Sequence, residues 1–266
     1  MKVMIMGFGN MGKTYANSFI SSRFIKPEDI HVLVRDANKI QSESGIPAVN
    51  FSDVPTTKIS EFDIIILSVK PQDFKQLAKT IQPFMKENQL ILSIMAGVTI
   101  SSIQNELQCG KIVRSMPNIP TQIGMGMTVF TASSAVDRKE LFIIQNLINT
   151  TGKSVYVEEE KLLNAATAIS GSGPAYVFYF MDAMIKAAVG LGFNESEAEL
   201  LVNQTFMGSV AMQNSYSLSN EEWIAKVASK GGTTESALKV FNENAVALHT
   251  IEAINAANTR AIELGS

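Results

Sequence analysis

Lys2-Val-Met-Ile-Met-Gly7-Phe-Gly-Asn-Met-Gly12 opens the chain and contains the pattern G-x-G-x-x-G directly after a short apolar run. The apolar run predicts a strand, and the pattern of Met11–Ile20 predicts a helix that begins among the glycines. In such a strand–turn–helix, Gly7 allows a tight turn, Gly9 leaves room for a pyrophosphate and Gly12 lets the helix pack closely on the sheet. The first N–H groups of the helix add partial positive charge. The stretch therefore predicts a dinucleotide site, with a functionless glycine-rich turn as the alternative.

Short β-rich runs alternate with helical patterns up to Val157. The predicted strands are 2–6, 30–34, 62–69, 90–94, 111–114, 127–131 and 154–157, and the predicted helices are 11–20, 72–85, 100–107 and 141–149. Beyond Glu158 only helices are predicted, at 161–167, 175–191, 195–216, 221–228, 234–242 and 245–263. Alternation of this kind predicts a parallel sheet with right-handed crossovers. We therefore expect an α/β fold, with a doubly wound Rossmann-type domain at 1–157 and an all-α domain at 158–266.

Composition excludes several classes of function. The 266 residues carry 22 Lys+Arg and 25 Asp+Glu, a net charge of −3, which argues against a nucleic-acid-binding protein. One cysteine and two histidines leave no material for an intrachain disulfide and little for a metal cluster. No secretory leader is recognisable, and the longest apolar stretch contains Asp182 and Lys186, which makes a membrane span costly. A cytoplasmic protein without metal is expected.

The second half carries more apolar surface than a small domain buries. Ala175–Leu191 is apolar nearly all round apart from Asp182 and Lys186, which is typical of a helix buried on most sides. A helical domain of this size buries such a helix poorly by itself. We therefore predict a homo-oligomer that associates through the helical domain. Burial against the first domain alone is the alternative.

Polar residues at the predicted strand ends indicate the type of cofactor. Arg35 follows Gly12 by 23 residues, and an arginine there suits a 2′-phosphate, whereas the adjacent Asp36 suits a ribose hydroxyl. We favour NADPH, with NADH as the alternative. Val69-Lys70-Pro71 ends a buried strand and would border the cofactor. Asn118 is expected near the nicotinamide, although a turn-capping role beside Pro117 is equally compatible with the local sequence.

Two glycine-rich loops stand in the helical half, Ser170-Gly-Ser-Gly-Pro174 and Ser229-Lys-Gly-Gly-Thr-Thr234. The second exposes backbone N–H groups at Gly231 and Gly232, adds two threonine hydroxyls and precedes a helix, which together suit a carboxylate. The alternative is that both loops only start helices.

These motifs resemble the pyrroline-5-carboxylate reductase family over essentially the whole length. The resemblance rests on Gly7–Met11, Val69–Pro71, Ala96-Gly-Val-Thr99, Met116-Pro-Asn118, Ala168–Tyr176 and Gly231–Thr234, in the order of the family. It implies hydride transfer from NAD(P)H to the C=N bond of Δ1-pyrroline-5-carboxylate, which gives L-proline. It also implies a homodimer through interlocked helical domains, which can assemble further into rings.

The resemblance also implies roles for single residues. The cofactor would contact Gly7, Gly9, Asn10, Met11, Arg35, Val69, Lys70, Pro71 and Asn118. The substrate would bind to Ser229, Gly231, Gly232, Thr233 and Thr234 of the partner chain. Backbone N–H groups around Gly231, Gly232 and Thr233 would hold its carboxylate, and the Thr234 hydroxyl would hydrogen-bond the ring nitrogen as the catalytic group.

Lys230 and Ile119 depart from the residues most common in the family, as do Ala225 and Lys226. These departures leave a non-catalytic, NADP-binding paralogue as one alternative. A second alternative is a hydroxy- or keto-acid reductase with a lysine general acid, for which Lys161, Lys186 and Lys226 would be the candidates.

Overall fold

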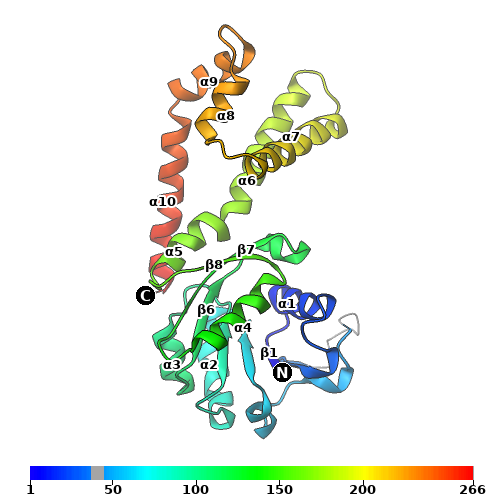
Figure 1. The fold of residues 1–266 in the computed structure, drawn as a ribbon, viewed down its shortest axis with the longest axis vertical. Helices are drawn as coiled ribbons and strands as arrows, with labels where there is room; N and C mark the ends of the chain where they lie inside the picture. Colours follow the sequence, from blue (N-terminus) through cyan, green and yellow to red (C-terminus); the bar gives the residue numbers. More distant parts are fainter. Residues whose placement is uncertain (37–44, 266) are drawn as a thin grey trace. The chain divides into compact units, whose positions relative to one another are not determined.

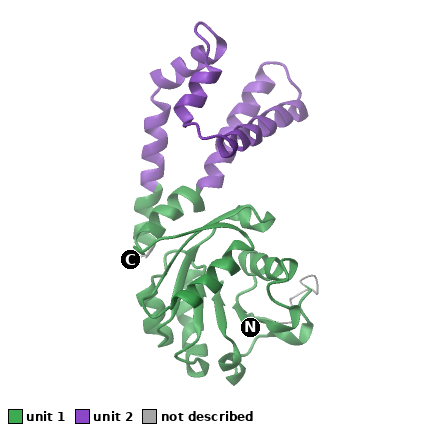
Figure 2. Ribbon diagram, viewed as in Figure 1, with its two compact units in different colours: residues 1–172, 257–266 green, residues 173–256 purple. Residues whose placement is uncertain are grey.

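The computed structural model describes residues 1–36 and 45–265. Its contacts divide the chain into two units, which Figure 2 shows in different colours. The first, here the nucleotide unit, contains residues 1–172 and 257–266, and the second, the helical unit, contains residues 173–256. The boundary predicted after Val157 lies before this division, and residues 158–172 group with the first unit, where Arg114 pairs with Glu160 and Asn118 binds Ser170.

One sheet forms the centre of the nucleotide unit, and the predicted α/β class with a Rossmann-type sheet is confirmed (Figure 1). The strands lie in the order β3-β2-β1-β4-β5-β6-β7-β8. Their bounds are β1 Val3–Met6, β2 Ile30–Leu33, β3 Phe51–Ser52, β4 Ile64–Leu67, β5 Leu90–Ser93, β6 Ile112–Met116, β7 Gly126–Ala132 and β8 Gly152–Tyr156. The strand order reverses direction at β1 and β4, and ligands of such sheets bind beyond the carboxyl ends of strands at this point.

The sheet departs from the predicted parallel arrangement at one pair of strands. β6 and β7 pair antiparallel, with Ser115 opposite Phe130. The chain between them holds only a 3-10 turn at Ile119–Ile123, and a parallel crossover needs a longer connection, commonly a helix. The sequence prediction also missed β3, because a strand of two residues leaves no periodic pattern.

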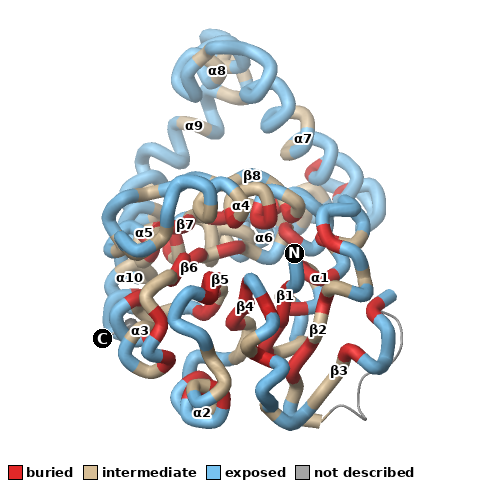
Figure 3. Tube along the Cα trace, turned by 60° about the horizontal axis from the view of Figure 1, so that its bottom comes forward, coloured by how far each residue is buried: buried red, intermediate tan, exposed pale blue. Residues whose placement is uncertain are grey.

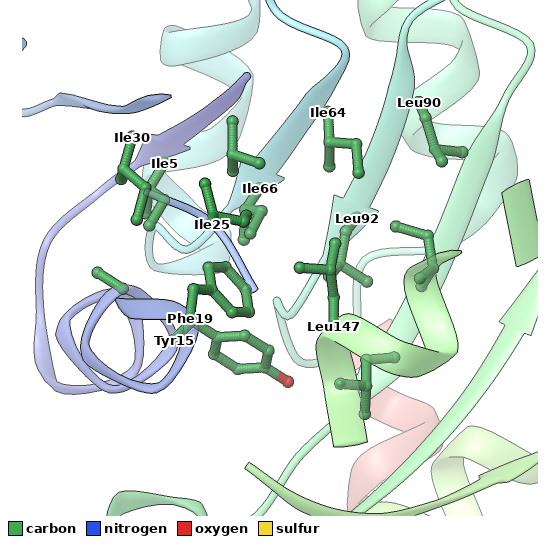
Figure 4. Packing of buried hydrophobic residues seen from close by; sticks show 14 of the residues in the cluster. Ile5, Tyr15, Phe19, Ile25, Ile30, Ile64, Ile66, Leu90, Leu92 and Leu147 are labelled. Carbon is green, nitrogen blue, oxygen red and sulfur yellow. The ribbon is translucent and has the colours of Figure 1, made fainter. Parts of the chain in front are cut away.

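Side chains alternate between two apolar layers on the faces of the sheet. Val3 and Ile5 point into a layer covered by α1 and α4, whereas Met4 and Met6 point into a layer covered by α2 and α3. Figure 4 shows part of the first layer. The helices are α1 Asn10–Ser21, α2 Pro71–Ile81, α3 Ile100–Leu107 and α4 Arg138–Asn149. Burial on both faces explains why the central strands read as continuous apolar runs.

Residues after β8 continue in the nucleotide unit as a short helix that widens into a π-turn. α5 runs from Leu162 to Ala166, and the π-turn from Thr167 to Gly171. The predicted helix at 161–167 agrees with α5 but does not include the widened turn.

The helical unit consists of helices and connections, as predicted. Its helices are α6 Gly173–Gly190, α7 Glu195–Ser215, α8 Asn220–Val227, α9 Thr233–Glu243 and most of α10 Val246–Gly265, whose last turns belong to the nucleotide unit. Capping boxes start α7 at Asn194 and α8 at Ser219. Only Ala198 and Val202 are buried between residues 173 and 256, and Figure 3 shows these helices mostly in the colour of exposed residues. Among the described residues, no helix has the length and apolar character to span a membrane.

Candidate active site

The glycine loop lies at the carboxyl ends of β1 and β4, where the strand order reverses. Gly7 has a φ of +94°, and a Cβ atom there would lie 2.6 Å from the carbonyl oxygen of Ser68. A Cβ atom on Gly12 would collide with the carbonyl oxygen of Gly7, whereas one on Gly9 would meet no atom within 4 Å. Gly7 and Gly12 are therefore required by packing, and Gly9 leaves open space where a ligand can approach the backbone.

The start of α1 has the electrostatic character of an anion site. Gly9 is its N-cap and supplies no side-chain cap, and no acidic residue stands in the first turn. Its first N–H groups and positive helix end are therefore available to a phosphate. Asn10 is exposed and Met11 is half-buried, and the Met11 sulfur lies 3.8 Å from the Thr121 hydroxyl.

Arg35 and Val69–Pro71 follow neighbouring parts of the same sheet edge. Arg35 follows β2, its side chain is 88% exposed, and its Nη2 lies 3.4 Å from Oδ2 of Asp73 in the first turn of α2. Lys70 is the N-cap of α2 and Pro71 its first residue. Asp73 was missed by the sequence reasoning, although an acid in the first turn of a helix is a recognisable signal.

Asn118 lies beyond β6, and its side chain binds two main-chain groups. Its Nδ2 donates to the carbonyl oxygen of Ser170 at 3.1 Å, and its Oδ1 accepts from the Met127 N–H at 2.9 Å. A Cβ atom on Gly171 would lie 2.7 Å from the end of the Met116 side chain. The structure thus brings the Met116–Asn118 and Ser170–Pro174 motifs together.

An ion pair between a buried arginine and a half-buried glutamate lies two residues before Met116 along β6. Arg114 of β6 is 5% exposed, and its Nη1 lies 2.7 Å from Oε1 of Glu160. The same carboxylate oxygen accepts from the N–H of Ile100, at the start of α3. Removing one partner of such a pair would strand a buried charge. The sequence reasoning missed this pair, although an arginine at the end of an apolar strand pattern was a visible signal.

The Ser229–Thr234 loop joins α8 to α9 within the helical unit. Gly231 has a φ of +75°, and its N–H donates to Oε2 of Glu235 at 2.7 Å. The N–H of Gly232 donates to the Ser229 carbonyl oxygen at 3.0 Å. Gly232 is the N-cap of α9, without a side-chain cap. Two of the three predicted carboxylate donors are therefore bound to groups of the same loop and helix.

The two threonines of this loop form the first turn of α9. Thr233 is exposed and Thr234 is half-buried. Ser229 is exposed, and a Cβ atom on Gly232 would lie 2.6 Å from its hydroxyl oxygen. The loop residues belong to the helical unit, whereas the predicted cofactor residues all belong to the nucleotide unit.

The remaining candidates for chemistry have structural surroundings. Cys109 is buried, its thiol donates to the Lys86 carbonyl oxygen at 3.1 Å, and burial raises its pKa to about 11. Burial, followed by Lys58 and Lys2, lowers the pKa of His31, whose ring packs edge-on against Phe62. Among the described residues, no group of three or more His, Cys, Asp or Glu side chains is arranged to hold a metal ion.

Comparisons with known proteins match the whole chain. A family model of pyrroline-5-carboxylate reductase dimerisation matches residues 160–264, and one described as NADP oxidoreductase, coenzyme F420-dependent, matches residues 2–97. A pyrroline-5-carboxylate reductase of Aquifex aeolicus is 35% identical, over 99% of this chain and 97% of the relative.

Two solved structures have the same fold over the whole length. The structure of a pyrroline-5-carboxylate reductase from Coxiella burnetii has a TM-score of 0.91 at 30% identity and covers 100% of this chain and 98% of that one. The Plasmodium falciparum pyrroline carboxylate reductase, solved with NADP bound, has a TM-score of 0.88 at 27% identity, with the same two coverages.

Proposed function

Because this chain belongs to the pyrroline-5-carboxylate reductase family, we propose that it reduces Δ1-pyrroline-5-carboxylate to L-proline with NADPH. The observation that carries the proposal is the open glycine loop at the switch point of the sheet, in a chain whose relatives match it from end to end. The bound cofactor supplies the hydride, which goes to the carbon of the C=N bond.

The nucleotide unit would bind the cofactor along its sheet edge. The first turn of α1, with Gly9, Asn10 and Met11, would hold the pyrophosphate by its N–H groups. Arg35 would exchange Asp73 for the 2′-phosphate, because a phosphate carries more charge and accepts the guanidinium in a bidentate manner. Val69, Lys70 and Pro71 would border the nucleotide where β4 ends, beside Gly7. The nicotinamide would lie beyond β6, at the edge where Asn118 stands.

The substrate would bind at the Ser229–Thr234 loop. Its carboxylate would take the backbone donors of Gly231, Gly232 and Thr233 and benefit from the positive end of α9. Thr234 would orient the ring nitrogen through its hydroxyl. Since an imine protonated at nitrogen is already electrophilic, placement of the two reactants supplies most of what the protein must contribute.

We further propose that the working form is a homodimer joined through the helical unit, with the loop supplied by the partner chain. The match of residues 160–264 to the dimerisation model and the exposed apolar side chains of α6 and α7 support this proposal. Assembly into rings and a cytoplasmic location stay predictions.

One assay tests the activity. NADPH oxidation is followed with Δ1-pyrroline-5-carboxylate, with a 2-keto acid and with neither, and we expect turnover in the first mixture only. Turnover with the keto acid would favour a reductase with a lysine acid, whereas binding of NADPH without turnover would favour a non-catalytic paralogue. KM values for NADPH and NADH are compared in the same assay, and a lower value for NADH would contradict the assignment of Arg35.

Thr234→Ala tests the role of the hydroxyl. We expect kcat/KM for the imine to fall by roughly tenfold or more, which corresponds to about 1.4 kcal/mol of transition-state stabilisation. Thr250→Ala is the matched control, because Thr250 is a half-buried threonine of α10 outside the loop, and its hydroxyl donates to the Val246 carbonyl oxygen of the same helix. Unchanged kinetics in Thr234→Ala would remove this hydroxyl from the mechanism.

A further inference from the structure

Three sequence motifs that lie far apart in the chain meet around Asn118. Its Nδ2 donates to the carbonyl oxygen of Ser170 at 3.1 Å, and its Oδ1 accepts from the N–H of Met127 at 2.9 Å. Its main-chain oxygen accepts from the Thr121 hydroxyl at 2.8 Å, and the same hydroxyl lies 3.8 Å from the sulfur of Met11. The glycine loop, the end of β6 and the turn before α6 are thereby connected.

The partner of the Asn118 amide is an unusual piece of backbone. Thr167–Gly171 is a π-turn, closed by the Ser172 N–H at 2.8 Å from the Thr167 carbonyl oxygen. Single π-turns interrupt the regular hydrogen-bond ladder and occur frequently at functional sites. Gly171 also lies against Met116, so close that an added Cβ atom would be 2.7 Å from the methionine methyl group. Hydrogen bonding and packing therefore hold the same turn against the end of β6.

A second side chain of β6 holds the other end of this segment. Arg114 pairs at 2.7 Å with Glu160, which lies just before α5, and the same carboxylate binds the N–H of Ile100. Residues 160–171 are thus fixed to one strand at both ends. This arrangement leaves the Ser170–Gly171 turn little freedom to move away from the edge of the sheet.

We propose that Asn118 is a positioning residue of the reductase reaction, which holds the Ser170–Gly171 turn against the edge where the nicotinamide binds. The proposal rests on the proposed function, because only that function puts a nicotinamide at this edge. The nitrogen and the oxygen of the Asn118 amide are each bound to a main-chain group, which favours an action through the turn over the direct cofactor contact that the sequence predicted.

Asn118→Asp is the sharpest variant. The aspartate keeps an oxygen for the Met127 N–H and the same shape, but it replaces the donor to Ser170 with an oxygen that the carbonyl repels. We expect faster amide hydrogen exchange in residues 167–172 of the protein without ligands. We also expect kcat/KM for the imine to fall at least tenfold. The kinetic isotope effect measured with NADPH deuterated at the transferred hydrogen should increase. The Kd for NADPH should stay within threefold of the wild-type value.

Asn146→Asp is the matched control, because the Asn146 amide also donates to a carbonyl oxygen, that of Phe142, but on the exposed face of α4. Asn146→Asp should change neither the amide hydrogen exchange of residues 167–172 nor kcat/KM for the imine. If Asn118→Asp does not fold, Asn118→Ala takes its place, since it removes the same donor without adding charge.

Two results would overturn the proposal. Unchanged exchange in residues 167–172 would show that Asn118 does not hold the turn. A Kd for NADPH that rises in proportion to the loss of kcat/KM would show direct contact with the cofactor instead. A wild-type chain that binds NADPH but does not reduce the imine would overturn the proposed function, and with it the catalytic part of the proposal, whereas the exchange measurement would still decide the link to the turn.

Discussion

The two units of this chain differ in how far they bury their apolar side chains. In the nucleotide unit the central strands are buried on both faces, and even a charged residue, Arg114, has a partner at 2.7 Å. In the helical unit α6 has no buried residue, and Phe178, Tyr179 and Leu200 are each more than 60% exposed. The nucleotide unit therefore has its own core, whereas the helical unit exposes apolar side chains that the proposed dimer would bury.

The largest expected effect comes from a charge on the apolar surface of the helical unit. Phe178→Asp, on α6, should leave the fold of the nucleotide unit intact and separate the proposed dimer, because burying an unpaired carboxylate in its interface would cost about 3–5 kcal/mol. Light scattering at micromolar concentration should give the mass of a monomer. Lys139→Glu, on the exposed face of α4, is the control for charge change, and a dimeric Phe178→Asp would contradict the comparison.

A second change tests the packing of the nucleotide unit, which has its own core. Ile66→Ala removes a side chain that is fully buried in β4, and the free energy of unfolding should fall by about 2–5 kcal/mol. In the Phe178→Asp background, Val240→Ala should change it by less than about 0.5 kcal/mol, because Val240 is 54% exposed. Urea denaturation measures the free energy of unfolding of both variants. Equal losses of this free energy at the two positions would mean that the helical unit is as well packed as the nucleotide unit.

The sequence predicted what depends on local pattern. The roles of Gly7, Gly9 and Gly12 follow from the spacing of the glycines, and the space around each of them agrees with that reading. The link between Asn118 and Ser170 joins residues 52 positions apart, and no local pattern in the chain announces it. The antiparallel direction of β7 follows from the short connection after β6, which holds only a 3-10 turn, and the sequence prediction overlooked that signal.

For the same reason, the sequence predicted some parts of the candidate site and missed others. Its backbone donors and glycines belong to single motifs, so they could be named in advance. The contacts that engage them, such as Asp73 with Arg35 and Glu235 with Gly231, depend on how each helix begins against its loop. Sequence reasoning therefore named the ligand-binding groups but not the side chains that bind them in the absence of ligand.

Burial inside the nucleotide unit also predicts a response to alkali. Burial raises the pKa of Tyr15 to about 12, although the Thr128 and Thr151 hydroxyls oppose the shift. An unfolded tyrosine has a pKa near 10, so the neutral phenol stabilises the fold fully below about pH 10, and this contribution is lost as the pH rises toward 12. Between pH 9 and 11, thermal unfolding should show about 1 kcal/mol more loss in the wild type than in Tyr15→Phe. Tyr156→Phe is the control, because Tyr156 in β8 is 40% exposed. Identical pH profiles of stability for the wild type and Tyr15→Phe would contradict the argument.

The smallest expected effect concerns the loop of the helical unit. Glu235→Gln removes the charge that lies 2.7 Å from the Gly231 N–H, so the substrate carboxylate meets a weaker competitor and less repulsion. The KM for the imine should fall about threefold, a change in the range of exposed charge interactions. Glu243→Gln, at the other end of α9, is the matched control. A rise in KM would mean that Glu235 shapes the loop for the substrate instead of competing with it.

The glycine N-caps of α1 and α9 have a consequence for folding itself. Capping boxes complete the starts of α4, α7 and α8, whereas α1 and α9 begin at Gly9 and Gly232, which have no side chain to offer. Under the proposed function, a pyrophosphate and a carboxylate arrive at these two starts and accept the hydrogen bonds that a serine or aspartate accepts elsewhere. Under this proposal the two ligands complete the hydrogen bonding of the first turns of α1 and α9, and binding of either ligand should slow amide hydrogen exchange in the turn that it contacts.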